Sequence, residues 1–538
     1  MEKRFWFLIL LFFFVFRLPG LCCCPQWFWD EGANLEYASN LMEGGAEYFG
    51  YRYNFVPHPP AYIVLTSLLV GVLGRHIWVL RLFSVLCALG GLFFAVRLGQ
   101  EHGGGSLGWF SGLVFAVFPE LIFWNKTGYA NNLLGLQALA SIYFLTTYLK
   151  SGENRFLAYT VLVLGFACLT QYTAAVFVLA AFVVLYAKGQ KSKSCMVFLF
   201  SISPLLLFAG YMVFFWEGFF LEDLVNYFSF YPHASAVALM VIFLFFLLKV
   251  YSKGLLRFFD YLSRTYESDE TPADFVVYLL ASLFSLKMVT TQNFFEGFPS
   301  AILIWCFIGL IKLRKSSLRD VLWVYTGVWF LALLSANRWD HMSIPLVYLT
   351  SLGAAVLVEG LWRRVKVFSE KTLLSPKQVK LLITLPLILI LGVDILLFSF
   401  GGIGCMDVES LMGAIAYVNR NVGEGDLVVG MSYINQYLEC ETTIHSLSLA
   451  YDGVPFAYFR REYEDREFVG DISFSNAGYT IVPAGLRDYL KKEYPPAYNV
   501  LADFNVAYSF NLSNKKSHLN QDKDTVTEFL VLENPSLA

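Results

Sequence analysis

The sequence predicts a polytopic α-helical membrane protein of about 13 transmembrane helices, followed by a small soluble α/β domain. Hydrophobic residues make up 57% of the 538 residues and charged residues only 15%, whereas soluble domains average about 25% charged residues. Apolar runs near membrane length recur throughout residues 1–400. Residues 401–538 lack such runs and hold 10 Lys/Arg against 19 Asp/Glu. This change in composition indicates a separate acidic domain.

The first apolar run follows Lys3 and Arg4 and extends to about Cys24. No small-residue cleavage site ends it, so a retained helix is favoured over a cleaved signal peptide. Twelve further apolar segments are expected to span the membrane. They are Val79–Arg97, Gly105–Trp124, Asn132–Leu149, Phe156–Thr170, Tyr172–Ala187, Cys195–Trp216, Ser235–Lys249, Asp274–Lys287, Phe298–Leu313, Val321–Ser335, Ser343–Leu361 and Leu381–Phe400.

The apolar stretch Pro60–Gly74 is too short to span, because a transmembrane helix needs about 20 residues. If it does not span, the Lys/Arg clusters of the later loops all fall on the inner face, as the positive-inside rule requires. We therefore expect a helix at the outer surface, within a first outer loop of residues 25–78. The same count places residues 401–538 on the outer face. The chain is therefore predicted to be an integral, multi-pass membrane protein whose functional site lies on the extracytoplasmic face.

Several function classes are excluded by what the sequence lacks. There is no basic domain or basic stripe, which argues against nucleic acid as a partner. P-loop, dinucleotide-binding, HExxH and GxSxG motifs are absent, and the nine cysteines show no zinc spacing. A disulfide between Cys405 and Cys440 stays open if the C-terminal domain lies in an oxidising compartment.

Two adjacent carboxylates, Asp30 and Glu31, directly follow the first apolar run and are flanked by tryptophans. Carboxylates at this depth are costly unless they are paired, bound to metal or facing water. They are the predicted catalytic residues. The alternative is a solvated loop that the tryptophans anchor at the interface.

The predicted outer loops also hold cations and polar side chains that suit a lipid phosphate and a sugar. Any one of them alone is more often structural than catalytic. The predicted ligands of a donor phosphate are His58, Arg81, Lys126 and Arg338, and the predicted substrate-binding residues are Asn131, Asn132, His233, Asp340 and His341.

The order of these features resembles the GT-C glycosyltransferases that use polyprenyl-phosphate sugars. The closest patterns are those of the protein O-mannosyltransferase and lipid A aminoarabinose transferase group. By this resemblance Asp30 matches the family's catalytic acidic residue, and Arg81 matches an arginine that recurs after the surface helix starting at His58-Pro59-Pro60. Many members have an Asp where this chain has Asn131 and Asn132, so a second carboxylate is missing there. A divalent metal is an optional cofactor, and none is certain.

The resemblance implies an inverting displacement. Asp30 would act as general base on an acceptor hydroxyl, and cations would stabilise the departing lipid phosphate. The implied donor is a polyprenyl- or dolichyl-phosphate sugar, with mannose the commonest, and the acceptor is a protein, a glycan or a lipid. Membrane lipids are the remaining partners. No Trp-Trp-Asp motif of the oligosaccharyltransferase branch occurs in the tail. A polyprenyl-lipid transporter or flippase and a non-catalytic scaffold are the rival classes.

Overall fold

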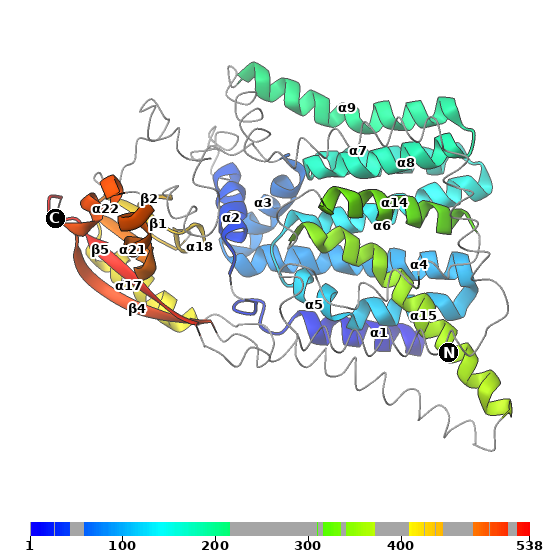
Figure 1. The fold of residues 1–538 in the computed structure, drawn as a ribbon, viewed down its shortest axis with the longest axis horizontal. Helices are drawn as coiled ribbons and strands as arrows, with labels where there is room; N and C mark the ends of the chain where they lie inside the picture. The colour runs from blue at the N-terminus through cyan, green and yellow to red at the C-terminus, as the bar shows by residue number, and fades with distance from the viewer. Residues whose placement is uncertain are drawn as a thin grey trace.

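The computed structural model describes most of the chain in twelve ranges. These are residues 2–25, 27–42, 59–215, 309, 316–334, 341–371, 408–423, 426–435, 437–444, 477–493, 495–514 and 525–537. Within them, a bundle of helices forms one part of the molecule and a small sheet with its helices forms the other (Figure 1). The predicted segments Ser235–Lys249, Asp274–Lys287, Phe298–Leu313 and Leu381–Phe400 lie almost entirely outside the described residues.

The described helices of the bundle follow the predicted apolar segments. They are α1 (Glu2–Arg17), α4 (Ile77–Val117), α5 (Pro119–Asn125), α6 (Ala130–Ser151), α7 (Asn154–Cys168), α8 (Ala175–Ala187), α9 (Lys191–Phe215), α14 (Ser317–Leu334) and α15 (Ile344–Lys371). Among described residues, two helices are long and apolar enough to cross a membrane, Ile77–Val117 and Lys191–Phe214. Other apolar helices, α7 and α8 among them, are shorter.

Helix α4 contains the reversal of chain direction that was expected between the predicted segments Val79–Arg97 and Gly105–Trp124. Gly104 has φ 77° and ψ −166°, a conformation that side chains rarely permit. A Cβ built on Gly99 would lie 2.8 Å from the Leu107 carbonyl oxygen and 2.9 Å from the Gly108 Cα. The two halves therefore pack against each other at glycines, as membrane helices commonly do.

Helix α6 lies in the core of the bundle and packs against α4, α7, α14 and α15. Gly135 of α6 lets the Tyr348 ring of α15 approach closely, because a Cβ there would be 2.8 Å from ring atoms. Tyr348 is fully buried. Close contact at a small residue fixes the position of α15 against the start of α6.

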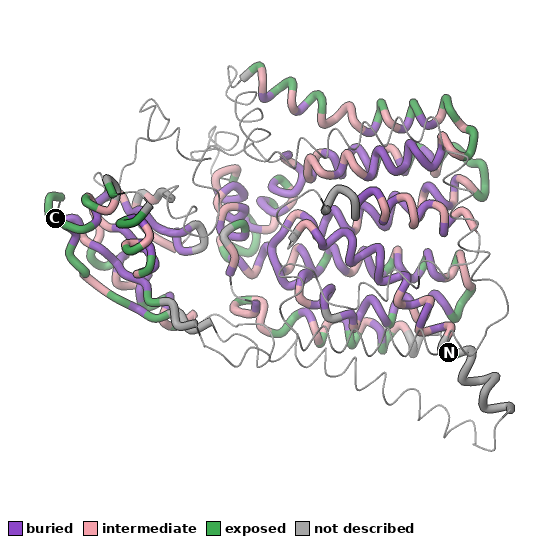
Figure 2. Tube along the Cα trace, viewed as in Figure 1, coloured by how far each residue is buried: buried purple, intermediate pink, exposed green. Residues whose placement is uncertain are grey.

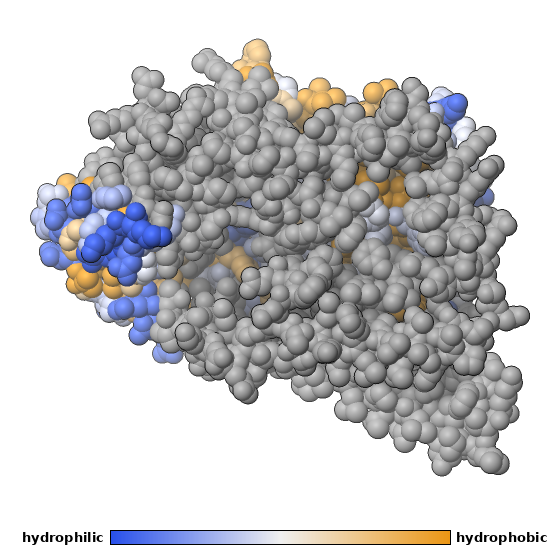
Figure 3. Space-filling view, in the orientation of Figure 1, coloured by the Kyte–Doolittle hydropathy of each residue, from blue (hydrophilic) through white to orange (hydrophobic). Residues whose placement is uncertain are grey.

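The outward face of α9 is apolar and exposed. Leu199, Phe200, Leu207 and Phe214 are each more than half exposed, and Figures 2 and 3 show this edge as exposed and hydrophobic. A contiguous apolar surface of this kind marks a membrane or protein contact. It matches the lipid-facing surface expected for a membrane helix.

Helix α2 (Trp29–Met42) and helix α3 (Ala61–Leu73) lie together at the end of the bundle that faces the sheet (Figure 1). Helix α3 has 13 residues, fewer than the roughly 20 that span a bilayer. Its length agrees with the expectation that Pro60–Gly74 does not cross the membrane. Val64, Leu68 and Val72 form an exposed apolar stripe on it.

The C-terminal part contains a five-stranded sheet of order β2-β1-β3-β5-β4. Its strands are β1 (Leu427–Gly430), β2 (Glu441–Ile444), β3 (Tyr479–Pro483), β4 (Asn505–Asn514) and β5 (Thr525–Glu533). Strand β1 pairs in parallel with β2 and β3, whereas β5 pairs antiparallel with β3 and β4. The accompanying helices are α17 (Val408–Asn421), α18 (Ser432–Asn435), α21 (Ala484–Glu493) and α22 (Pro495–Ala502). Helices and strands alternate in this part of the chain, as the predicted α/β class requires.

The sheet domain contacts the bundle through α18, which packs against α2. Next to α18, the Tyr437 ring stacks on Trp27 at 5.4 Å between ring centroids and on His76 at 6.3 Å. Cys440 of this domain is a free cysteine. The disulfide left open between Cys405 and Cys440 is therefore not formed, whereas Cys24 of the first loop is disulfide-bonded.

Candidate functional site

The first turn of α2 is built around the carboxylate of Glu31, which is completely buried. The Phe28 amide donates to Oε2 at 3.0 Å, and the Gly128 amide donates to Oε1 at 2.6 Å. The first bond closes the N-terminus of α2, where an acidic side chain is favourable. The second ties this turn to the loop between α5 and α6.

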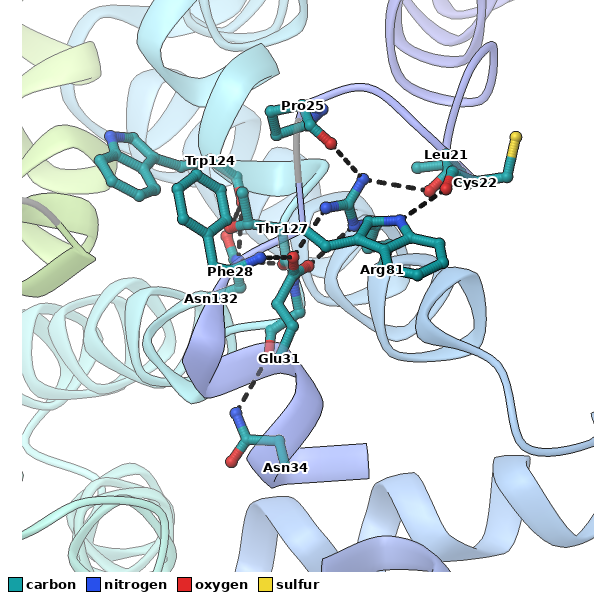
Figure 4. A network of polar contacts seen from close by, with 12 residues as sticks. Leu21, Cys22, Pro25, Phe28, Glu31, Asn34, Arg81, Trp124, Thr127 and Asn132 are labelled. Carbon is teal, nitrogen blue, oxygen red and sulfur yellow. Dashed lines mark hydrogen bonds and ion pairs between the residues drawn. The ribbon is translucent and has the colours of Figure 1, made fainter. Parts of the chain in front are cut away.

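Arg81 on α4 completes the environment of Glu31 (Figure 4). Its Nε donates to Oε1 at 2.8 Å and its Nη2 to Oε2 at 2.7 Å, a two-bond pair between fully buried side chains. Nη1 donates to the carbonyl oxygens of Leu21 at 3.2 Å and Pro25 at 2.8 Å. Paired geometry of this kind is the strong form of an ion pair. It holds the loop before α2 against α4.

Asp30 lies in the same first turn of α2 but is exposed. The two adjacent carboxylates thus have opposite environments. Glu31 has both oxygens occupied by four donors, whereas the Asp30 side chain is accessible from outside. A base that takes a proton from a bound hydroxyl must be accessible in this way.

Lys126 follows α5 and is almost fully buried, at 3% exposure. Burial, reinforced by the nearby charge of Arg81, lowers the pKa of Lys126 to about 8. Within the described residues its ammonium has no carboxylate partner. A buried cation without an anion is costly, so this position favours an anionic ligand.

Arg17, at the end of α1, is a second buried cation beside this site. Its guanidinium donates to the carbonyl oxygens of Ala116 at 2.6 Å and Phe115 at 2.9 Å, and to Asn125 Oδ1 at 2.9 Å. These partners are neutral. Arg17 therefore adds a positive charge that no described carboxylate cancels.

A chain of amides connects Arg17 to α6 and α15. The Asn125 Nδ2 donates to Asn132 Oδ1 and to the Tyr348 hydroxyl, both at 2.9 Å. Asn132 in turn donates to the carbonyl oxygens of Trp124 and Thr127. Asn132, predicted as a substrate ligand, thus orders the loop that holds Lys126.

The predicted site residues divide into four groups. Glu31, Arg81, Lys126 and Asn132 come together around the start of α2, with Asp30 on the exposed side. Asn131 points elsewhere, because its Oδ1 accepts from Gln171 Nε2 at 2.9 Å. His341 belongs to the short helix η3 (His341–Ser343). The predicted residues His58, His233, Arg338 and Asp340 lie outside the described residues.

Sequence reasoning missed Arg17, Asn125 and Tyr348. For Arg17 a signal was present, since an arginine near the end of an apolar run is a functional hypothesis in membrane proteins. Tyr348 gave none, because one tyrosine in an apolar helix is ordinary. Among the described residues, no group of three or more His, Cys, Asp or Glu is placed to hold a metal ion.

Residues 57–214 match the family described as dolichyl-phosphate-mannose-protein mannosyltransferase. A search of curated proteins gives no significant match. In fold, the chain is similar to the oligosaccharyltransferase of Archaeoglobus fulgidus in complex with zinc and sulfate, with a TM-score of 0.54 and 11% identity. That match covers 94% of this chain and 72% of the other.

The same archaeal enzyme in its apo form gives a TM-score of 0.54 at 12% identity, over 98% and 75% of the two chains. ArnT from Cupriavidus metallidurans bound to undecaprenyl phosphate gives 0.45 at 12% identity, over 98% and 97%. The predicted resemblance is confirmed by the family match. The chain therefore contains a segment, residues 57–214, that matches this family, and its fold is similar to that of the archaeal oligosaccharyltransferase.

Proposed function

We propose that the chain transfers mannose from a polyprenyl or dolichyl phosphate to a hydroxyl of a protein, glycan or lipid acceptor on the outer face of its membrane. The observation that carries this proposal is the buried ammonium of Lys126, without a carboxylate partner among the described residues. It lies beside a turn whose carboxylate, Glu31, is already satisfied by Arg81. The description of the matched family supports mannose as the sugar.

In the proposed reaction, the Asp30 carboxylate takes the proton of the acceptor hydroxyl as general base. The acceptor oxygen attacks the anomeric carbon while the bond from that carbon to the phosphate oxygen breaks. The lipid phosphate leaves on the opposite side, so the configuration at the anomeric carbon inverts. Lys126 and Arg17 stabilise the charge that grows on the leaving phosphate, as fixed cations do in a water-poor site.

Glu31 and Arg81 have a positioning role in this proposal. Both Glu31 oxygens accept hydrogen bonds from Arg81 or Gly128, and these bonds fix the first turn of α2, which also contains Asp30. Arg81 is neutralised by the same pair and contributes less to phosphate binding than Lys126. His58, Arg338, His233, Asp340 and His341 stay predictions as further ligands.

The outer-face location is supported by Cys24. This cysteine, in the loop between α1 and α2, is disulfide-bonded, and disulfides persist in oxidising compartments outside the cytosol. The loop that holds the site would then face the compartment that the positive-inside rule assigns to it.

The test is transfer from radiolabelled dolichyl-phosphate mannose by the protein purified in detergent. We expect Asp30→Asn to lower turnover by at least about 100-fold, the range of general base catalysis. The matched control is Glu36→Gln, a carboxylate further along α2, which should retain turnover. Full turnover by Asp30→Asn would refute the assignment of the base. Movement of the lipid across vesicle bilayers without any transfer would favour the transporter class instead.

A further inference from the structure

Helices α7 and α8 are shorter than the membrane-length helix beside them. Helix α6 has 22 residues, whereas α7 has 15 and α8 has 13. Because α6 and α7 pack side by side in opposite directions, the connection between α7 and α8 lies beside the first two turns of α6 and not beyond its end. The hydrogen bond from Gln137 Nε2 to Thr170 Oγ1, at 2.9 Å, fixes the position of this connection along α6.

Irregular backbone at membrane depth occurs where it is buried in protein or lines a polar cavity. Here the connection continues from Thr170 to the short helix η2 (Tyr172–Ala174). Helix α3 covers it, since the Ala61 amide donates to the Leu169 carbonyl oxygen at 2.8 Å. The surface helix next to the candidate site therefore also covers this connection.

A group of uncharged polar side chains gathers at this connection. We call it the amide cluster, and it consists of Asn131, Gln137, Thr170, Gln171 and Thr173. Gln171 Nε2 donates to Asn131 Oδ1 at 2.9 Å, and Thr173 donates to Gln171 Oε1 at 3.1 Å. Two polar atoms in the cluster, Asn131 Nδ2 and Gln137 Oε1, have no hydrogen-bond partner within the described part of the chain. Their residues are 1% and 4% exposed.

Unsatisfied buried amide groups are rare in proteins, and each one costs stability. One of the two is a donor and the other an acceptor. Six residues separate them on α6, which is about 9 Å along the helix axis. A ligand with hydroxyl groups on both ends can satisfy both atoms, because a hydroxyl donates and accepts.

The cluster adjoins the proposed phosphate site through two neighbouring residues. Asn132 belongs to the chain of amides that leads to Asn125 and Arg17, and Asn131, the next residue, belongs to the amide cluster. The N-terminus of α6 therefore contacts both groups. A sugar phosphate is a molecule with a charged end and a hydroxyl-rich end that matches this juxtaposition.

We infer that the amide cluster binds the sugar ring of the donor and selects an uncharged hexose. This inference rests on the proposed function, which it deepens by assigning the residues that bind the sugar of the donor. All five side chains of the cluster are neutral, so an amino sugar or an acidic sugar would have a charge with no counterion there. Neutral hydroxyls, by contrast, satisfy the two unpartnered atoms.

The experiment compares two probes, polyprenyl phosphate without sugar and dolichyl-phosphate mannose, in binding to the purified full chain. Gln137→Met removes one unpartnered atom and leaves Thr170 bonded to the Phe166 carbonyl oxygen. We expect this variant to bind the sugar-free lipid as the wild type does, and to bind the mannosyl lipid about tenfold more weakly, the value of one lost hydrogen bond. The matched control is Gln190→Met, the same change at the far end of the bundle.

Asn131→Leu is the second variant, and its thermal unfolding is measured in parallel, because it also breaks the bond to Gln171. A donor with an amino sugar is the third probe, and we expect the wild type to bind it at least about tenfold more weakly than the mannosyl lipid. If the ratio of the affinities for the sugar-free lipid and the mannosyl lipid is the same in both variants as in the wild type, the inference is overturned and the proposed function stays intact. Failure of the wild type to bind sugar-free polyprenyl phosphate would overturn the proposed function, and the inference with it.

Discussion

A cluster of charged residues near α2 and one ion pair at the opposite end of the helical bundle differ in their burial. At the end near α2, Arg17, Glu31, Arg81 and Lys126 are between 0% and 3% exposed. At the opposite end, the Lys150–Glu101 pair is 3.1 Å long, with side chains 38% and 48% exposed.

Exposed pairs contribute little to stability, whereas buried charges are costly unless each one is matched. Of these four buried residues near α2, Arg81 and Glu31 pair with each other, whereas Arg17 and Lys126 have no carboxylate partner among the described residues. The two unpaired cations, Arg17 and Lys126, indicate that this end of the bundle is suited to bind an anion and is not optimised for stability.

Breaking the buried pair should have the largest effect. Arg81→Ala leaves the Glu31 carboxylate buried without its cation, which is expected to cost about 3–5 kcal/mol of unfolding free energy. Thermal unfolding in detergent measures this loss. Arg97→Ala, an exposed arginine on the same helix, is the control and should change little. A double variant, Arg81→Leu with Glu31→Leu, should recover part of the loss, and no recovery would contradict the role of the pair.

Removing the ammonium of Lys126 should weaken lipid binding without lowering the stability of the fold. Lys126→Met is expected to weaken binding of polyprenyl phosphate by about 10- to 100-fold, the value of a charged hydrogen bond. Because a buried charge without a partner disappears, the unfolding temperature should stay the same or rise. Lys150→Met at the other end is the control. Equal affinities for the lipid in both variants would remove Lys126 from the phosphate site.

The pH dependence of Lys126 sharpens this comparison. Its pKa of about 8, against an ordinary value of 10.5, means that the ammonium loses its proton as the pH rises through 8. Affinity for polyprenyl phosphate should therefore fall above about pH 8, and Lys126→Arg should remove this fall, since arginine stays charged. Between pH 8 and 10.5 the unfolded chain binds a proton that the folded chain does not. The contribution of Lys126 to the unfolding free energy should then rise with pH. A binding curve that is flat to pH 10 would refute this reading.

The smallest effect is expected at the exposed Lys150–Glu101 pair. Glu101→Gln breaks the pair with Lys150, which should change the unfolding free energy by less than about 1 kcal/mol. Raising the salt concentration should abolish even this difference. A loss of unfolding free energy as large as that of Arg81→Ala would mean that burial does not determine the contribution of these two ion pairs.

The sequence predicted a helical bundle with a small C-terminal α/β part and most of the described helices, because apolar runs and their breaks are local signals; the number of transmembrane helices stays a prediction. The Gly104 reversal and the helix after Val408 both follow from residues near them. The sequence also placed Asp30, Glu31 and Lys126 at one end of the bundle. It did not predict which carboxylate is exposed, since that depends on Arg81, 50 residues away in sequence from Glu31. The cations and amides of Arg17, Asn125 and Tyr348 meet only through tertiary packing.

The peptide groups of Gly128 form hydrogen bonds with two helices that precede it in the chain, α2 and α3. Its amide donates to Glu31, and its carbonyl oxygen accepts from Asn34 Nδ2 at 3.2 Å and from the Tyr62 hydroxyl at 2.7 Å. A Cβ at this position would lie 2.8 Å from the Leu80 Cβ, so α4 also closes around it.

Loosening of α2, α3 or α4 would expose this one peptide group to solvent, which makes the three helices a cooperative unit around it. Hydrogen exchange at the Gly128 amide would therefore report on assembly of the whole entrance, since this proton is released only when the helices separate.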